Sequence, residues 1–251
     1  MYAIHPVDGL PEFLAGDDLP GILAQRLAQA EPGLRAGDIL VVTQKIVSKS
    51  EDRFVSLAAT QASQSAREVA AATGKDPALV EVVLRESNKI VRQAPNVLIT
   101  QHRSGHIMAN AGVDASNIGS DGEDRVLLLP KDPDDSAKRI AEACGNRIGI
   151  VPPVIISDSF GRPWRVGTVN VAIGLFGLPA IIDQRGEMDR DGRVMKVTQI
   201  AFADGVAAAA GLAMGEGREG LPACIVRGLQ WQGEAQSADA ILRPEREDLF
   251  R

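Results

Sequence analysis

The order of apolar and polar positions along the chain predicts a mixture of short buried strands and amphipathic helices. Two β-branched runs, Ile39 to Val42 and Val154 to Ile156, are uniformly apolar, which is typical of buried strands. Leu19 to Ala28 instead places its leucines and isoleucine at helical spacing, with Asp18 as a cap and Pro20 in the first turn. Strands and helices in this order indicate a fold of mixed α+β and α/β character.

The segment after Lys89 predicts a β-meander. Its strand-forming residues fall into three short runs, Ile90 to Gln93, Val97 to Gln101 and His106 to Ala109. His102 and His106 lie four residues apart, as zinc ligands on a helix do, but Ser104-Gly105 between them predicts a hairpin. We therefore expect strands here and no zinc site.

Cap signals mark further helices in both halves of the chain. Asp76-Pro77 opens one helix, and Asp132-Pro133 opens another after a strand at Val126 to Leu129. Because the strand at Val154 follows the second helix, we expect a strand-helix-strand crossover in this part of the chain. Thr198 to Met214 is long, apolar and rich in small residues, which predicts a core or interface helix.

Composition restricts the class of protein. The 251 residues include 45% hydrophobic and 24% charged side chains, which indicates a folded chain that can bury a core, with no long disordered tract. We expect one large domain over residues 1–230, with room for two subdomains, followed by a polar tail over residues 231–251. The net charge of −6 disfavours nucleic acid as a partner, so an anionic ligand has to be held locally.

The ends and cysteines of the chain predict a cytoplasmic protein. The first residues lack the basic and apolar regions of a signal peptide, and no apolar run approaches the ~20 residues that span a membrane. Cys144 and Cys224 form neither a CxxC pair nor a disulfide framework, which is typical of buried thiols in a reducing compartment.

The densest group of chemically useful residues follows the strand at Val154. The run is expected to end at Ser157-Asp158-Ser159, whose carboxylate and hydroxyl oxygens suit Mg²⁺ or Mn²⁺, and Phe160-Gly161 is expected to turn the chain. Arg162 and Arg165 come next, and guanidinium groups are common partners of phosphate oxygens. These residues predict a site for a phosphorylated ligand. The alternative is a turn capped by aspartate, with arginines paired to surface acids.

Three further segments offer phosphate or metal ligands. Asp114 and Asn117 lie among small residues that let a ligand approach the backbone, although a tight turn with an Asx cap explains the same pattern. Lys45 and Lys49 leave the strand at Ile39 and can bind phosphates, but lysines also protect exposed strand edges. The segment Gly215 to Gly220 matches GxGxxG, yet it follows a helix and precedes a strand, which rules out a Rossmann fingerprint. Its amides can still hold phosphates, with Glu216 as a third carboxylate.

Five segments together resemble one known family. They read VDGLPEF, VVTQKIVSK, NAGVDASN, SDSFGRPWRVGTVNVAIG and MGEGREGLPACIVRG, and their order is that of the coenzyme F420-0:L-glutamate ligase family. The likeness runs from residue 1 to about residue 230. It implies an intertwined homodimer that uses GTP, L-glutamate and a divalent metal, Mg²⁺ or Mn²⁺, with K⁺ as an additional candidate. The reaction implied is the addition of glutamate to the phospholactyl carboxylate of F420-0 through an acyl phosphate, releasing GDP and phosphate.

The resemblance also assigns site residues by position. Asp114, Asp158, Ser159 and Glu216 resemble metal ligands. From the chemistry of the side chains, and not from the resemblance, we expect Lys49, with Arg162 or Arg165, to add fixed positive charge beside Asp158 in the reaction. The positions that resemble the nucleotide site are Leu10, Pro11, Glu12, Phe13, Gln44, Lys45, Lys49, Asn117, Met214, Gly215, Glu216, Gly217, Arg218, Glu219, Gly220 and Leu221. Gln44 and Lys45 stand where some members carry small hydroxyl residues.

Two alternatives remain open at this level. One is a different metal- and nucleotide-dependent acid–amino-acid ligase, since no residue by itself identifies a deazaflavin. The other is a non-catalytic nucleotide-binding relative, which the presence of all three carboxylates disfavours.

Overall fold

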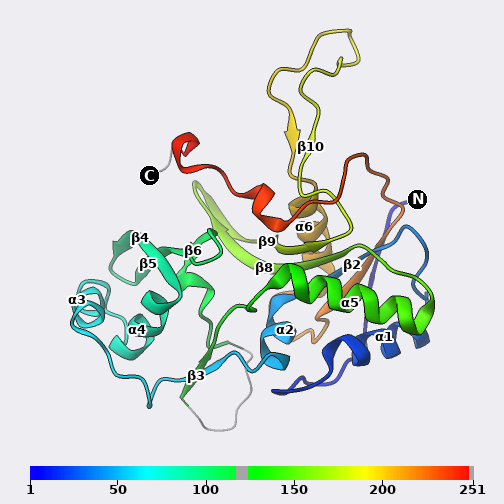
Figure 1. Ribbon diagram of the computed structural model, residues 1–251. Helices are drawn as coiled ribbons and strands as arrows, with labels where there is room; N and C mark the ends of the chain where they lie inside the picture. The colour runs from blue at the N-terminus through cyan, green and yellow to red at the C-terminus, as the bar shows by residue number, and fades with distance from the viewer. Residues whose placement is uncertain (117–123, 249–251) are drawn as a thin grey trace.

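A five-stranded mixed sheet forms the centre of the protein in a computed structural model that describes residues 1–116 and 124–248 (Figure 1). The strand order is β1-β12-β2-β8-β9, in which β2 and β8 are parallel and every other pair is antiparallel. The strands are β1 (Ala3–Pro6), β12 (Ala223–Arg227), β2 (Ile39–Thr43), β8 (Val154–Arg162) and β9 (Arg165–Phe176). The mixed α/β class that the sequence predicts is therefore confirmed.

Helices cover both faces of this sheet. The helices α1 (Leu19–Gln29) and α5 (Pro133–Ile148) pack on one face, and α6 (Phe202–Met214) packs on the other (Figure 1). Alternate residues of β2 divide between the two cores, with Leu40 facing α1 and α5 and Val41 facing α6. Because both faces are covered, β2 can be apolar throughout, which explains why its sequence shows no alternation.

A smaller lobe carries the meander. Its strands are β4 (Ser87–Ala94), β5 (Val97–His102) and β6 (Ile107–Ala109), which pair antiparallel in that order as the sequence predicts. The helices α3 (Gln64–Thr73) and α4 (Pro77–Arg85) close a separate core against it. A short 3₁₀ turn, η1 (Asn110–Gly112), leads from β6 to Asp114.

The predicted crossover over α5 is wrong. The strand before the helix, β7 (Arg125–Leu127), pairs with β3 (Phe54–Ser56) in a separate two-stranded ribbon and not with β8. The parallel neighbour of β8 is β2, which is more than 100 positions earlier in the sequence. Local order of elements could not distinguish these pairings, because the partner of β8 is decided by the packing of distant segments.

The hairpin of β8 and β9 also differs from the prediction. The strand β8 continues through Asp158 to Arg162, and Pro163-Trp164 makes the turn that was predicted at Phe160-Gly161. A β-bulge opposite Ile156 and Ser157 gives β9 one extra residue there. Asp158 therefore lies just beyond the bulge, inside the hairpin, and not at a strand end.

The lysines Lys45 and Lys49 lie on a helix, α2 (Gln44–Ser50), which begins directly after β2. Since β2 lies between β12 and β8, it is an interior strand, and the interpretation of these lysines as protection of a sheet edge is wrong. Their spacing of four residues instead places both on one side of α2.

Two segments project from or cross the main body. A two-stranded arm, β10 (Ile182–Asp183) and β11 (Gln199–Ile200), occupies the start of the predicted helix at Thr198, so α6 begins later, at Phe202 (Figure 1). Residues 231–248 contain only the 3₁₀ turns η2 (Ala238–Ile241) and η3 (Glu245–Glu247). Although this segment is polar, Trp231 packs against Phe202 of α6.

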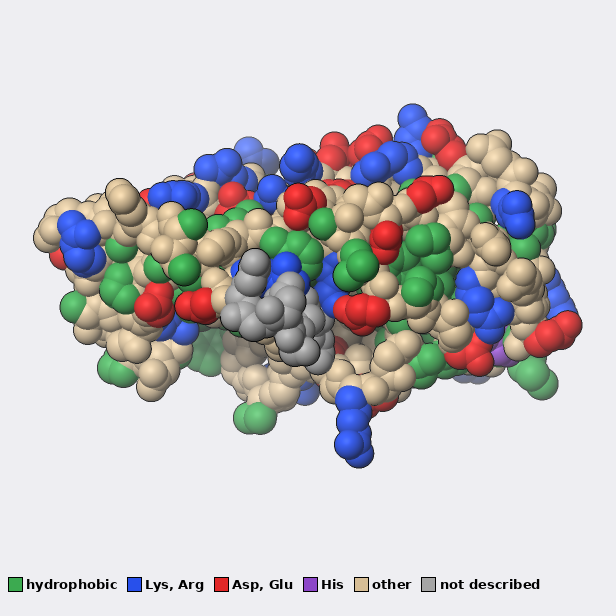
Figure 2. Space-filling model, turned by 90° about the horizontal axis from the view of Figure 1, so that it is seen from below, with side chains coloured by type: hydrophobic (Ala, Val, Ile, Leu, Met, Phe, Trp, Pro, Cys, Tyr) green, Lys and Arg blue, Asp and Glu red, His purple; other side chains and the backbone are tan. Residues whose placement is uncertain are grey.

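Cys144 and Cys224 are buried and free, as predicted. Among residues 1–116 and 124–248, no helix has both the length and the apolar character needed to cross a membrane. Figure 2 shows Lys, Arg, Asp and Glu side chains interspersed on the face viewed from below. Charges of both signs on one face are in keeping with an anionic ligand that is held in a local pocket.

Candidate active site

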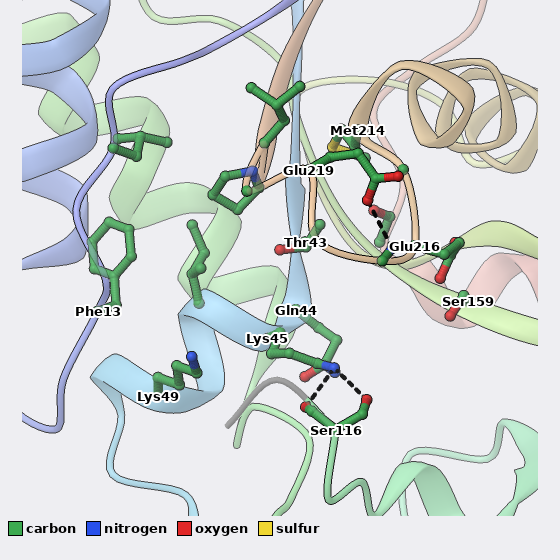
Figure 3. Close-up of a pocket in the computed structure, with 18 of the residues that line it drawn as sticks. Phe13, Thr43, Gln44, Lys45, Lys49, Ser116, Ser159, Met214, Glu216 and Glu219 are labelled. Atoms are coloured by element: carbon green, nitrogen blue, oxygen red, sulfur yellow. Dashed lines mark hydrogen bonds between the residues drawn. The ribbon is translucent and has the colours of Figure 1, made fainter. Parts of the chain in front are cut away.

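One cavity of about 390 Å³ gathers most of the predicted site residues (Figure 3). It lies where β2 ends and α2 begins, and its walls come from the loop after β1, the β8–β9 hairpin, Asp114 and the turn after α6. Each residue predicted for the metal or nucleotide lines it, except Asn117, which lies outside the described residues. The segments are far apart in sequence, so the cavity exists only because the sheet joins them.

The two aspartates of the cavity have opposite electrostatic environments. Desolvation by burial raises the pKa of Asp158 to about 6, and the charge of Asp114 adds to this rise. Ser159 N donates to Asp158 Oδ1 over 2.9 Å. Burial also acts to raise the pKa of Asp114, but hydrogen bonds from Lys45 and Ser116 outweigh it, so this pKa lies below its ordinary value.

Gln44 lies beside Asp158 in the cavity, and its own orientation is fixed by a hydrogen bond. Ser48 Oγ donates to Gln44 Oε1 over 2.8 Å, which leaves the amide N–H groups of Gln44 for the carboxylate of Asp158. Gln44 and Ser48 are both buried. The first turn of α2 thus fixes a neutral donor beside the partly buried carboxylate of Asp158, and a neutral donor compensates little of its charge.

Lys49 is the more buried lysine, with 4% of its surface exposed, and it pairs with Glu12 of the loop after β1. The carboxylate of Glu12 lies on the surface, since 71% of that side chain is exposed. A buried ammonium group whose partner is exposed to solvent is well suited to bind an anion. Phe13 of the same loop is buried and anchors it (Figure 3).

The glycine-rich turn after α6 closes the cavity opposite α2. Gly215 and Gly220 have positive φ angles of 76° and 68°, a conformation that other residues adopt at a cost, while Gly217 does not. Glu219 accepts a hydrogen bond from Gly217 N over 2.8 Å, so one backbone amide of the turn is already engaged. The turn follows α6 and precedes β12, as predicted, which confirms that it is not a Rossmann fingerprint.

Glu216 is held by a residue that the sequence reasoning missed. Asn170 Nδ2 donates to Glu216 Oε1 over 2.6 Å, and Ser157 Oγ donates to Asn170 Oδ1 over 3.3 Å. Asn170 lies on β9 and is buried. The signal that marks it is a lone amide in the apolar run from Val169 to Ile173, where a buried polar side chain requires partners.

The two predicted arginines lie outside the cavity lining. Arg162 and Arg165 face each other across the turn of the β8–β9 hairpin, and Arg162 donates to Val166 O over 3.3 Å. Both are exposed. Within one chain, positive charge in the cavity therefore comes from Lys45, Lys49 and Arg218.

The donor set fits a cation at the two aspartates better than at all four predicted ligands. Asp158 is a partly buried carboxylate whose pKa is raised mainly by desolvation, and the Asp114 charge lies close enough to contribute to that rise. Glu216 is instead bound to Asn170. In the part of the chain that the structure describes, no three Asp, Glu, His or Cys side chains gather closely enough to hold a metal ion.

Comparison with known proteins identifies close relatives along the whole chain. A family model described as F420-0:Gamma-glutamyl ligase matches residues 9–228. Three curated relatives are each called Coenzyme F420:L-glutamate ligase. The protein of Methanothermobacter thermautotrophicus is 43% identical over 248 residues, covering 98% of this chain and 97% of the relative. The protein of Methanopyrus kandleri is 42% identical over 252 residues (99% and 97%), and that of Methanocaldococcus jannaschii is 40% identical over 247 residues (96% and 94%).

Proposed function

Because the chain belongs to the F420-0:gamma-glutamyl ligase family, we propose that it uses GTP to join L-glutamate to the carboxylate of coenzyme F420-0. Membership of the family makes it a ligase that forms C–N bonds. The nucleotide, the acceptor and the acyl-phosphate route are our proposal. They are supported by a single cavity that holds two carboxylates, two lysines and a glycine-rich turn.

The chemistry of amide formation requires an activated carboxylate. A carboxylate oxygen of F420-0 attacks the γ-phosphorus of GTP, the bond to the bridging oxygen breaks, and GDP leaves. The amine nitrogen of glutamate then attacks the acyl carbon, phosphate leaves with the bonding electrons, and the amine proton passes to solvent or to a base. Fixed cations stabilise both steps, because negative charge is concentrated on the transferred phosphoryl oxygens.

Lys49 is the residue best placed for that role. Its ammonium is buried in the wall, and Glu12 is its partner at the surface, so a phosphate can take the place of Glu12. The turn from Met214 to Leu221 contributes backbone N–H groups on the opposite wall. Leu10 and Pro11, anchored by the buried Phe13, add apolar surface beside Lys49 for the nucleoside part of GTP.

Mg²⁺ or Mn²⁺ is part of the proposal, with Asp114 and Asp158 as the residues that would hold it and Ser159 beside them. A bound divalent cation supplies charge neutralisation between phosphate oxygens. A bound cation would offset the desolvation penalty that raises the pKa of Asp158, so cation binding and loss of the proton favour each other at neutral pH. Glu216 could add its second carboxylate oxygen to this set while Asn170 holds its Oε1.

A homodimer is also proposed. The tip of the β8–β9 hairpin exposes Trp164 and Val166 with exposed fractions of 87% and 101%, next to Arg162 and Arg165. Tryptophan and arginine are enriched at the energetic centres of protein interfaces. If this tip packs on a second copy, the two arginines lie at the interface between copies, where they can add positive charge to the partner's cavity.

The test is incubation with F420-0, L-glutamate, GTP and Mn²⁺, followed by mass spectrometry of the products. We expect F420-0 to gain glutamyl units, with one GDP and one phosphate formed for each unit added. Omission of either acceptor or glutamate is the control for uncoupled GTP hydrolysis. Formation of AMP and pyrophosphate would exclude the acyl-phosphate route, and ligation of glutamate only to other acids would exclude F420-0 as the acceptor.

A further inference from the structure

The ammonium group of Lys45 lies in a cage of three oxygen atoms, two of which belong to Ser116 and can be followed in Figure 3. Its Nζ donates to Asp114 Oδ2 over 2.7 Å, to the Ser116 carbonyl oxygen over 2.9 Å and to Ser116 Oγ over 3.0 Å. An ammonium group has three N–H donors, so every donor of Lys45 has a partner within the protein. Lys45 therefore has no N–H donor left for a phosphate unless it breaks one of these hydrogen bonds.

The cage is built by its own turn and does not depend on the lysine for its shape. Ser116 N donates to Asp114 Oδ1 over 2.8 Å, and Ser116 Oγ donates to Asp114 Oδ2 over 2.8 Å. A carboxylate, a carbonyl and a hydroxyl oxygen are the ligand types that hard cations prefer. The arrangement around Lys45 Nζ is thus that of a cation site whose cation is covalently attached to α2.

We propose that Lys45 is a tethered cation, which permanently fills one cation position beside Asp114 and replaces a free ion there. This inference deepens the proposed function, since it takes Asp114 as a cation ligand of the same cavity. A free metal ion would then be held mainly on the Asp158 side. Lys45 and Lys49 lie four residues apart on one helix and have different roles. Lys45 compensates the charge of Asp114, and Lys49 binds phosphate.

The geometry favours this role over direct contact with GTP. To reach a phosphate, Lys45 would have to give up three hydrogen bonds and leave Asp114 without its ion pair in a partly buried place. Among the described residues, Lys49 has one ion-pair partner to release, the exposed Glu12. The charge of Lys45 also acts on Asp158, so the tethered cation lies near both aspartates of the cavity.

Lys45→Met tests the proposal, because methionine keeps much of the apolar stem and removes the ammonium. The vacated cage should accept a free cation of similar size, and NH₄⁺ is the matching probe. In thermal unfolding, the variant should gain stability as NH₄Cl or KCl is raised into the millimolar range, whereas tetramethylammonium chloride, which is too large for the cage, should have no such effect. The unmodified protein and Lys138→Ala, an exposed lysine on α5, should show the same small response to all three salts.

Metal stoichiometry gives a second measurement that needs no substrate. In calorimetric titration with Mn²⁺ in monovalent-free buffer, Lys45→Met should bind one more ion per chain than the unmodified protein. If Lys45→Met does not fold, Lys45→Ala takes its place, since it also removes the ammonium and leaves the cage open. Equal Mn²⁺ stoichiometry in both proteins, or a stabilisation by NH₄⁺ that does not depend on residue 45, would overturn the proposal. Neither measurement involves GTP or F420-0, so a failure of glutamate ligation would leave this result unchanged.

Discussion

Asp158→Asn should make the protein more stable while it removes activity. Burial raises the pKa of Asp158 from its ordinary 3.8 to about 6, so the ionised side chain at neutral pH is unfavourable in the folded chain. Each tenfold change in proton affinity corresponds to about 1.4 kcal/mol, which gives an upper limit of about 3 kcal/mol for the stability gained. Asparagine can still accept the hydrogen bond from Ser159 N. We expect a gain of about 1–3 kcal/mol in the metal-free protein.

The gain should depend on pH in a defined direction. Well below pH 3.8 the aspartate is protonated in both the folded and the unfolded chain, so the substitution changes little. As pH rises from about 4 to about 6, the unfolded chain releases its proton first, and the unmodified protein loses stability relative to the variant. The full difference is therefore reached above pH 6.

Thermal unfolding in EDTA between pH 4.5 and 8 measures this difference. A chain of this size changes its melting temperature by about 2–4 °C for each kcal/mol. Mn²⁺ should then stabilise the unmodified protein and leave Asp158→Asn nearly unchanged. Asp204→Asn is the matched control, because burial raises its pKa too, it accepts Ala172 N over 2.9 Å, and it does not line the cavity. That control should gain stability, keep its activity and keep its response to Mn²⁺.

Three results would refute this reasoning. Equal or lower stability of Asp158→Asn at pH 7.5 would show that the carboxylate is adequately compensated. A stability difference that is constant from pH 4.5 to pH 8 would separate it from the ionisation of Asp158. Full turnover by the folded variant at saturating Mn²⁺ would remove Asp158 from the reaction.

Two further substitutions test residues outside the cavity lining, one on α6 and one directly before β6. Gly211→Ala on α6 should lower turnover severalfold, because its Cβ would lie 2.5 Å from Asn170 Nδ2 and push this residue away from Glu216. Gly205→Ala on the same helix has no atom within 4 Å of its new Cβ, so it should keep activity and gain up to about 1 kcal/mol in the free energy of unfolding. Equal turnover of the two variants would show that Asn170 does not position Glu216. His106→Gln should flatten the acid loss of stability measured by urea unfolding at pH 7 and pH 5. Burial lowers the pKa of His106 to about 4, so the unfolded chain takes up the proton first and stability falls as pH drops below about 6.5. If His106→Gln shows the same difference in the free energy of unfolding between pH 7 and pH 5 as the unmodified protein, that loss belongs to other groups.

The sequence by itself determined the features that depend on a few neighbouring residues. Asp18, Asp76 and Asp132 cap their helices as predicted, each with a side-chain oxygen that accepts a backbone N–H of the first turn. The meander after Lys89 was predictable because its turn residues and strand-forming runs lie within about two dozen positions. Four of the five segments that line the cavity could also be named in advance, since each carries a local cluster of glycine, acid or lysine, whereas the loop after β1 was named only through the resemblance to the family.

What the tertiary structure decided is how those segments meet. Whether Asp158 ends a strand depends on its pairing with β9 and on the bulge opposite Ile156, and neither is encoded locally. The cage around Lys45 joins α2 to Asp114, 69 positions away in the sequence. The strand β2 is interior because β12 and β8, both distant in sequence, flank it. Burial and hydrogen bonding across such separations set the charge of each side chain, which is why sequence could nominate the site residues but could not assign their partners.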